Sequence, residues 1–290
     1  MKKTKILVPV YNDWRSVFKL LEEINAHLEG WDAHISVVII NDASTEVRPI
    51  NTPLLKNLRS IYVINMKENK GHARCNAAGL KYINENEDFD FVIVMDGDGE
   101  DRPQELGDLL CKSYENTDKV ITADRVKRSE GLFFKFCYLV HKYLTFIFTG
   151  QSIKFGNYSC LPKFAVNIMT KQASTWSSFS GSLAKTIKNR MSVSSIRGER
   201  YFGPSKMSFI SLLKHSLSIM AVFKTTLLIR SIIFLIIYLF LVIGKISVIT
   251  LIPVIAVIIM MFLVITLSKR ENKSEFDKSL ENINSIDKIK

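Results

Sequence analysis

The sequence predicts an α/β fold in which a doubly wound, mostly parallel sheet is followed by a membrane-spanning helical hairpin. Three observations predict this fold. Short β-branched runs alternate with helical patterns over the first hundred residues, in the order strand, helix, strand, strand, helix, strand. Polar residues follow the strands, at the edge where an open α/β sheet binds its ligands. Two long apolar runs then occupy most of residues 227–267.

The elements of the sheet are predicted from periodicity. Runs of β-branched and aliphatic residues, each ending at a polar turn, predict strands at 5–10, 35–40, 60–64, 91–95 and 120–123. Apolar residues at helical spacing predict the helices between them, at 17–28, 72–84 and 106–114. This alternation is typical of parallel strands joined by crossover helices.

Composition and charge narrow the class of protein. The chain has 290 residues, enough for one or two domains, and a net charge of +11. No basic run is interleaved with aromatic residues, so we expect no nucleic-acid partner and assign the excess charge to a membrane with anionic head groups. The four cysteines are widely spaced, which predicts reduced thiols. The apolar run before Pro9 is too short for a signal peptide, so the N-terminal domain is expected in the cytoplasm.

The two apolar runs predict a transmembrane hairpin. Residues 227–244 and 246–267 each approach or exceed the length of about 20 residues that a spanning helix needs, and only Lys245 separates them. Arg230 lies near the start of the first run, where its side chain can snorkel. Basic residues flank the entry and the exit, which predicts an integral membrane protein with both termini in the cytoplasm. The charged cytoplasmic tail at 268–290 is predicted to be mobile.

Two further apolar stretches carry charges that disfavour insertion. Lys135 and Lys142 interrupt residues 131–149, and a buried lysine costs about 2.5–3.5 kcal/mol on insertion scales. Residues 207–224 have apolar side chains at helical spacing with lysines around them. We predict that both stretches form helices on the bilayer surface, the second as a juxtamembrane amphipathic helix. An ordinary core helix is the alternative for each.

Asp96 and Asp98 directly follow the apolar strand at 91–95. Two carboxylates one residue apart, at the edge where a sheet binds its ligands, repel one another unless a cation lies beside them. Hard divalent ions take oxygen ligands and often bridge carboxylates to substrate phosphates. The pair therefore predicts a diphosphate held by a metal ion. A polar turn that happens to contain acids is the alternative.

Four segments at strand ends together resemble the motifs of inverting family 2 glycosyltransferases. They are V-P-V-Y-N at 8–12, I-I-N-D-A-S-T at 39–45, N-K-G-H-A-R at 69–74 and D-G-D-G-E-D-R-P at 96–103. The resemblance covers nearly the whole chain and is strongest to the polyprenyl-phosphate branch, whose members include dolichol-phosphate mannosyltransferases and carry a C-terminal transmembrane hairpin.

This resemblance implies a GT-A fold, the nucleotide-diphospho-sugar-binding form of the sheet, over residues 1–206. It implies a metal-dependent hexosyltransferase that uses Mg²⁺ or Mn²⁺. The implied partners are a nucleotide-diphospho-sugar donor and a polyprenyl phosphate acceptor on the cytoplasmic face of a membrane. The bacterial inner membrane is the expected location, and a homo-oligomer is compatible with the resemblance.

The resemblance assigns contacts with the nucleotide base to the first two segments. Asp42 matches the acid that accepts a hydrogen bond from the base, and Asn41 replaces the acid that usually precedes it. Pro9 and Tyr11 match positions that shape the base pocket. A strand end followed by a core aromatic residue is the alternative for these two.

The family's metal segment commonly reads D-x-D-L-Q-D-P-P-E. Asp96 and Asp98 match its first acids and are candidate catalytic residues and metal ligands. Glu100 replaces the glutamine and is a third candidate ligand. Gly71 and Arg74 match the segment that lies near the diphosphate, and a solvated helix residue is the alternative for Arg74.

The nature of the sugar acceptor is inferred from two observations: the absence of a candidate general base, and the presence of basic residues that could bind a phosphate. No carboxylate pair that could act as general base is found at 150–200, and an acceptor phosphate needs none because it is largely deprotonated at pH 7. Arg125 and Arg128 match the basic acceptor loop of the polyprenyl-phosphate branch and are candidate catalytic residues. Arg200 and Lys206 match its R-x-x-G-x-S-K motif. A basic patch that holds anionic lipids is the alternative.

One segment departs from the family pattern. Many relatives read G-D-F-R-L where this chain has G-N-Y-S-C-L at 156–161, so Asn157 replaces a carboxylate near the place where donor and acceptor meet. Two other functions therefore stay open: a transferase that acts on a hydroxyl of a lipid-linked or cell-surface saccharide, and a catalytically inactive membrane scaffold. The Q-x-x-R-W signature of processive synthases is missing, which favours a single transfer.

Overall fold

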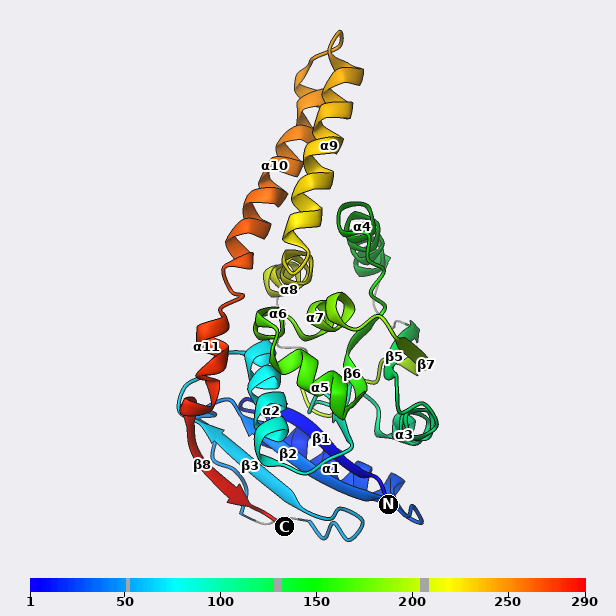
Figure 1. Cartoon of the computed structure of the whole chain (residues 1–290), viewed down its shortest axis with the longest axis vertical. Helices are drawn as coiled ribbons and strands as arrows, with labels where there is room; N and C mark the ends of the chain where they lie inside the picture. Colours follow the sequence, from blue (N-terminus) through cyan, green and yellow to red (C-terminus); the bar gives the residue numbers. More distant parts are fainter. Residues whose placement is uncertain (51–52, 128–131, 204–208) are drawn as a thin grey trace.

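The computed structural model describes residues 1–50, 53–127, 132–203 and 209–290. This part of the chain contains an eight-stranded sheet in the order β7-β5-β6-β4-β1-β2-β3-β8 (Figure 1). Its first four strands in sequence are parallel: β1 (Lys3–Val10), β2 (His34–Asn41), β3 (Ile61–Met66) and β4 (Phe91–Val94). β1 lies between β2 and β4, as in a doubly wound sheet, and the predicted mostly parallel arrangement is confirmed.

The remaining half of the sheet mixes strand directions. β6 (Phe155–Pro162) pairs antiparallel with β4 and with β5 (Val120–Lys127), while β5 pairs parallel with β7 (Arg190–Ile196). Ser159 lies opposite Val94 in the pairing of β6 with β4. Because the strands run in opposite directions, the residues before Ser159 lie beside the loop that follows β4.

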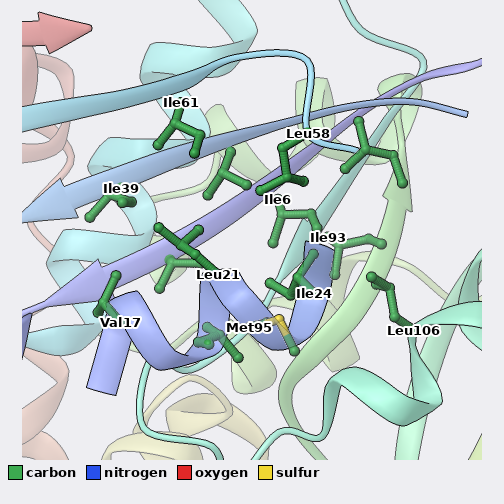
Figure 2. Close-up of a cluster of buried hydrophobic side chains, with 14 of the residues drawn as sticks. Ile6, Val17, Leu21, Ile24, Ile39, Leu58, Ile61, Ile93, Met95 and Leu106 are labelled. Carbon is green, nitrogen blue, oxygen red and sulfur yellow. The ribbon is translucent and has the colours of Figure 1, made fainter. Parts of the chain in front are cut away.

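Helices cover both faces of the sheet. α1 (Trp14–His27) and α3 (Leu106–Glu115) pack on one face in the cluster of apolar side chains drawn in Figure 2. The other face is covered by α2 (His72–Asn86), α5 (Lys163–Thr170), α6 (Ala173–Ser177) and α7 (Phe179–Thr186). Burial on both faces explains why the central strands are almost continuously apolar.

α9 (Lys224–Val242) and α10 (Val248–Ser268) form a hairpin that projects away from the sheet (Figure 1). The helical stretches Lys224–Val242 and Val248–Asp277 have mean hydropathies of 2.4 and 3.2, and only 11% of the apolar window in each is buried. Both are therefore long and apolar enough to cross a membrane, and they are not buried core helices of the sheet domain.

α4 (Leu132–Thr149) and α8 (Phe209–Ala221) pack at the base of this hairpin, so helices are confirmed in both of the stretches predicted to lie on a bilayer. Arg230 of α9 donates to the carbonyl oxygens of Phe146 and Ile147, at 3.3 and 3.0 Å. These carbonyls belong to the last turn of α4, where a helix runs out of backbone donors for its acceptors, although Phe146 O also accepts from the N–H of Gly150 at 2.8 Å. Arg230 therefore ties α4 to the hairpin.

The prediction of a mobile tail after the hairpin is wrong. Residues 269–290 contain α11 (Lys273–Asp277), a 3₁₀ turn at Ser279–Asn282, and β8 (Ile283–Lys288), which pairs antiparallel with β3. Phe276 of α11 is fully buried and stacks on Trp176, with ring centroids 5.5 Å apart. The charged sequence is ordered because it supplies the hydrogen-bonding partner for an otherwise exposed sheet edge.

Candidate active site

The polar segments after β1, β2 and β4 meet at one edge of the sheet, as their places at strand ends predict. Residues 96–101, after β4, form an acidic loop. Residues 41–46, after β2, form a turn that we call the asparagine turn because Asn12 and Asn41 hold it. α2 begins between the two, at His72.

The acidic loop folds back on itself. The backbone N–H of Asp96 donates to Asp101 Oδ2 at 2.9 Å, and the N–H of Glu100 donates to Asp98 Oδ1 at 3.0 Å. Gly99 has a φ of 92°, a left-handed conformation that glycine adopts without strain. The loop therefore concentrates several carboxylates in a small volume.

This concentration of charge changes the titration of the acids. Burial, together with the charge of Asp96, raises the pKa of Asp98 to about 6 and the pKa of Asp101 to about 7. Burial also acts to raise the pKa of Asp96, but His72 and Asn157 stabilise its charged form and hold its pKa well below the usual range. One ionised acid beside two that resist ionisation is typical of a functional site.

Three arginines from distant parts of the chain pair with the acidic loop. Arg125 pairs with Asp101 at 3.4 Å, and Arg197 pairs with Glu100 at 2.6 Å. Arg200 pairs with Asp98 of the loop and also with Asp13 outside it, at 2.8 Å from Asp13 Oδ2. The predicted acceptor-binding residues Arg125 and Arg200 thus lie directly at the predicted metal segment.

The segment that carries Arg197 and Arg200 lies along the acidic loop. The N–H of Gly198 donates to Glu100 O, and the N–H of Tyr201 donates to Asp98 O, both at 2.9 Å. A Cβ on Gly198 would lie 2.4 Å from Gly99 O, so the two backbones approach more closely than any side chain at 198 allows. The two arginines are therefore held in place by backbone as well as by charge.

Asn157 and His72 contact the first acid of the loop. Asn157 Nδ2 donates to Asp96 Oδ1 at 3.0 Å and lies 2.7 Å from His72 Nε2. His72 Nε2 is 3.2 Å from the same Asp96 oxygen. Desolvation lowers the pKa of His72, but Asp96 more than offsets it and raises that pKa. The amide that departs from the family pattern is therefore in direct contact with the predicted metal segment.

Asn12, an uncharged side chain, bonds directly to the backbone of the asparagine turn. Asn12 Oδ1 accepts from the backbone N–H groups of Thr45 and Glu46, at 2.8 and 3.0 Å. Asn12 and Ala43 have φ values of 50° and 56°, in the left-handed region, which asparagine adopts more readily than most residues but alanine only rarely. Strained backbone of this kind is concentrated at functional sites.

Asp42 joins the asparagine turn to the start of α2. Its two carboxylate oxygens accept from the N–H groups of Lys70 and Gly71, each at 2.9 Å, and the side chain is buried. Burial raises the pKa of Asp42, although these two hydrogen bonds act in the opposite direction. Gly71 has a φ of 89° and begins the helix. The contact of Asp42 with a base stays a prediction.

The other predicted base-pocket residues lie at the end of β1. Pro9 is buried within the strand, and Tyr11 follows it with 49% of its surface exposed, which leaves its ring available to a ligand. The predicted cations Arg128 and Lys206 lie outside the described residues.

Arg74 faces the C-terminal segment. Its Nη2 lies 3.3 Å from Glu275 Oε2 of α11, and its guanidinium lies 5.4 Å from the centre of the Trp176 ring. These contacts place it among residues that follow the hairpin, and its proposed proximity to a diphosphate stays untested.

Sequence reasoning missed several residues of this site. Asp101 is the third acid of the family's metal segment, and His72 lies inside the N-K-G-H-A-R motif, so both had a local signal. Asp13 and Arg197 had none, because only the tertiary pairing with Arg200 and Glu100 reveals them.

The donor set fits a hard divalent cation that binds together with a phosphate. Asp96 and Asp98 supply carboxylate oxygens in a loop with excess negative charge. The described residues contain no cluster of three or more His, Cys, Asp or Glu side chains that could hold a metal ion, and Glu100 is paired with Arg197. One or two carboxylates completed by substrate phosphates are a common site for Mg²⁺.

Comparison with known families decides the class of the chain. The sequence model described as Glycosyl transferase family 2 matches residues 5–170, which include all strands of the parallel half and the acidic loop. The chain belongs to glycosyltransferase family 2. The resemblance inferred from the four strand-end motifs is confirmed.

The relatives of this glycosyltransferase include transferases named for a lipid phosphate. The undecaprenyl-phosphate 4-deoxy-4-formamido-L-arabinose transferase of Klebsiella pneumoniae is 25% identical over 232 residues, covering 78% of this chain and 69% of that protein. The protein of the same name from Salmonella enteritidis is 25% identical over 235 residues, with the same coverage. The predicted resemblance to the polyprenyl-phosphate branch of the family is confirmed.

Solved structures confirm the GT-A fold. Glucosyl-3-phosphoglycerate synthase from Mycobacterium tuberculosis, in complex with Mn²⁺, UDP-glucose and phosphoglyceric acid, matches with a TM-score of 0.55 at 12% identity. The match covers 78% of this chain and 80% of that one. At this identity the similarity shows the arrangement of the sheet and its helices.

Proposed function

We propose that this glycosyltransferase moves one sugar from a nucleotide diphosphate to a polyprenyl phosphate, with inversion at the anomeric carbon. The observation that carries the proposal is the pairing of Arg125 and Arg200 with the acidic loop. It brings groups suited to phosphate next to carboxylates suited to a cation, at the ligand-binding edge of the sheet. The names of the Klebsiella and Salmonella relatives support the acceptor class.

The nucleotide is proposed to lie across the edge from the asparagine turn to the acidic loop. Asp42 and Tyr11 would contact the base, with Pro9 behind them. Gly71 and Arg74 would lie near the diphosphate. The strained turn and the half-exposed ring of Tyr11 support this placement.

Asp96 and Asp98 are the proposed ligands of Mg²⁺ or Mn²⁺, with Glu100 as a third candidate. A cation held there offsets the negative charge that grows on the departing diphosphate. The Mn²⁺ in the mycobacterial structure supports the proposal. The raised pKa values of Asp98 and Asp101 support it too, because a loop that resists carrying its full charge gains from a positive ligand.

The acceptor phosphate is proposed to bind Arg125 and Arg200, together with Arg128 and Lys206. An oxygen of this phosphate would form a bond to the anomeric carbon as the bond from that carbon to the diphosphate breaks on the opposite side. The acceptor needs no general base because its phosphate is largely deprotonated at pH 7. Planar guanidinium groups bind phosphate oxygens in pairs, which would orient the attack.

The hairpin of α9 and α10 is proposed to span the membrane, with the sheet and both termini in the cytoplasm of a bacterial cell. α4 and α8 would lie on the bilayer surface, where their exposed apolar residues, such as Phe146 and Ile210, contact lipid. Lysines and arginines near both ends of the hairpin support this orientation. The lipid phosphate could then reach the site while its chain stays in the bilayer.

A transferase acting on a saccharide hydroxyl is the second candidate, and His72 favours it. Its imidazole is half exposed beside Asp96 and could accept a proton from a hydroxyl. Because Asp96 raises the pKa of His72, however, its neutral form requires a higher pH than that of an ordinary histidine.

The test uses the full-length protein in detergent with undecaprenyl phosphate, Mg²⁺ or Mn²⁺, and radiolabelled nucleotide sugars. The panel includes UDP-glucose, UDP-N-acetylglucosamine, GDP-mannose and a UDP-pentose, since a hexose is expected and the named relatives act with a pentose derivative. Label that enters organic solvent, depends on metal and is lost in Asp98→Asn supports the proposal. Donor binding without extractable label points to a saccharide acceptor, and absence of donor binding points to a scaffold.

A further inference from the structure

The segment that follows the hairpin reaches the donor side of the sheet. β8 pairs with β3 so that Ser285 lies opposite Asn65. β3 pairs with β2 so that Asn65 lies opposite Asn41. Three adjacent strands therefore place polar residues in one row at the sheet edge. We call the row of Asn41, Asn65, Ser285 and Asp287 the amide row.

Hydrogen bonds run through the amide row in one direction. Asn41 Nδ2 donates to Asn65 Oδ1 at 2.9 Å. Asn65 Nδ2 donates to Ser285 Oγ at 2.9 Å and to Asp287 Oδ2 at 3.1 Å. Asn65 therefore accepts from Asn41 through its carbonyl oxygen and donates to β8 through its NH₂ group, and an ionised carboxylate at 287 can only accept. The residue types at these positions match this direction.

The amide row ends on the asparagine turn. Asn41 Oδ1 accepts from the N–H of Ser44 at 3.0 Å, and Ser44 Oγ accepts from the N–H of Asn12 at 2.9 Å. Asp287 also pairs with Arg48, just beyond the turn, at 3.0 Å. Asp287 therefore holds the turn on both sides, through Asn65 at its start and through Arg48 after its end.

The amide row also explains why the chain has Asn41 where its family usually has an acid. Asn41 donates to Asn65 and accepts from Ser44, so both ends of its side-chain amide are used. An ionised aspartate could accept from Ser44 but could not donate to Asn65. The departure from the family pattern therefore coincides with a contact that reaches the C-terminal strand.

We propose that Asp287 and Ser285 are positioning residues for nucleotide binding. They hold the asparagine turn in the strained shape that receives the base, acting through Asn65 and Asn41. The inference rests on the proposed function, since it takes this turn as the base site. It makes the segment after the membrane hairpin a part of the donor site, beyond its role in anchoring the sheet domain.

The test measures nucleotide affinity in the full-length protein in detergent. Titration calorimetry with UDP and, separately, with GDP, each with Mn²⁺, is applied to the wild type, Asp287→Ala and the double variant Ser285→Ala/Asp287→Ala. We expect the double variant to bind about tenfold more weakly, which corresponds to about 1.4 kcal/mol. The KM for the donor should rise by a similar factor while kcat changes little.

Two controls separate positioning from loss of folding. Asp287→Asn keeps an acceptor for Asn65, so it should recover most of the affinity that Asp287→Ala loses. Asn284→Ala alters an exposed residue of the same strand and should leave affinity unchanged. The melting temperature of Asp287→Ala should match that of Asn284→Ala.

The outcomes distinguish the inference from the proposed function. Unchanged nucleotide affinity in the double variant overturns the inference alone, while the function stands. Loss of affinity that follows the melting temperature and is not recovered in Asp287→Asn also overturns it, since the role would then be structural. A wild-type protein that binds neither nucleotide overturns the base site and the inference together.

Discussion

The acidic loop and the asparagine turn lie at the same edge of the sheet but are held by different forces. In the acidic loop, carboxylates are balanced by guanidinium groups from three distant arginines. In the asparagine turn, amide and hydroxyl groups bond directly to a strained backbone, and the ion pair of Asp287 with Arg48 lies just outside it. Ionic contacts depend on pH, salt and added cations, whereas neutral hydrogen bonds depend on geometry.

This difference suits the two ends of a nucleotide diphosphate. A base is neutral and flat, so a rigid turn with directed hydrogen bonds can recognise it. A diphosphate is negatively charged, and its negative charge grows as its bond to the sugar breaks. Its site therefore needs charged groups that can stabilise this additional charge during the reaction. The two regions should therefore respond differently to substitution and to pH.

The largest effect is expected from removing charge in the acidic loop. Asp98→Ala should lower the rate of sugar transfer by about 10²–10³-fold, because stabilisation of the developing diphosphate charge is lost. Radiolabel transfer at saturating donor measures it. Asp108→Ala, which removes an exposed acid on α3, is the matched control and should keep full activity. A loss smaller than tenfold in Asp98→Ala would show that the acidic loop is not the reaction centre.

Asn157→Asp tests the charge balance around Asp96. It replaces a hydrogen-bond donor 3.0 Å from Asp96 by a second carboxylate, which should cost about 1–3 kcal/mol of stability at pH 8. The cost should shrink at pH 5, where one of the two acids can hold a proton. Denaturant unfolding of the metal-free protein at both pH values measures it. Asn157→Ala loses the bond without adding charge, and an equal cost in both variants at pH 8 would contradict the role of charge.

Asn12→Ala tests how the asparagine turn is held, again by measuring stability at two pH values. It removes an acceptor for two backbone N–H groups, which should cost about 1–3 kcal/mol of stability, equally at pH 5 and at pH 8. Asn12→Gly loses the same acceptor but tolerates the left-handed backbone, so it should be more stable than the alanine variant by about 1–2 kcal/mol. A cost that varies with pH would mean that the hydrogen bonds of Asn12 depend on ionised groups nearby.

The smallest effect is expected from pH alone. Burial and Asp96 raise the pKa of Asp98 to about 6 and that of Asp101 to about 7, above the value of about 3.9 in an unfolded chain. The folded protein therefore holds these protons more tightly, so its stability should fall as the pH rises from about 4 to about 7. The raised pKa of His72 acts in the same direction.

Thermal unfolding of the metal-free protein at pH 5.5 and pH 8 measures this effect. The melting temperature should be lower at pH 8, and Mn²⁺ should recover part of the difference there by offsetting the charge of the acidic loop. Asp101→Asn should flatten the profile. A melting temperature that rises over this range would contradict the assigned cause.

Local patterns predicted much of the fold and part of the site. The parallel strands and their crossover helices were visible because both repeat within a few residues. Asp96 and Asp98 were visible as a pair after a buried strand. Asp13 and Arg197 were not visible, because a single charged residue in a loop carries no pattern until its partner from another part of the chain is known.

The segment after the hairpin shows where local patterns fail. Its charges predict a mobile tail, yet β8 completes the sheet and Phe276 stacks on Trp176. Charged residues on an edge strand face solvent on one side, so their composition resembles that of a disordered tail. The pairing that orders them comes from β3, more than two hundred residues earlier.

The doubly wound sheet, the apolar hairpin and the family follow from the order of the residues alone, because apolar periodicity and short motifs are properties of neighbouring residues. The three-dimensional fold shows which arginines balance the acidic loop and that Asn157 contacts Asp96. It also shows that the chain returns from the hairpin to pair with the sheet beside the asparagine turn. Those features join residues far apart in the chain, and their energies exist only once folding has brought the charges and hydrogen-bonding groups together.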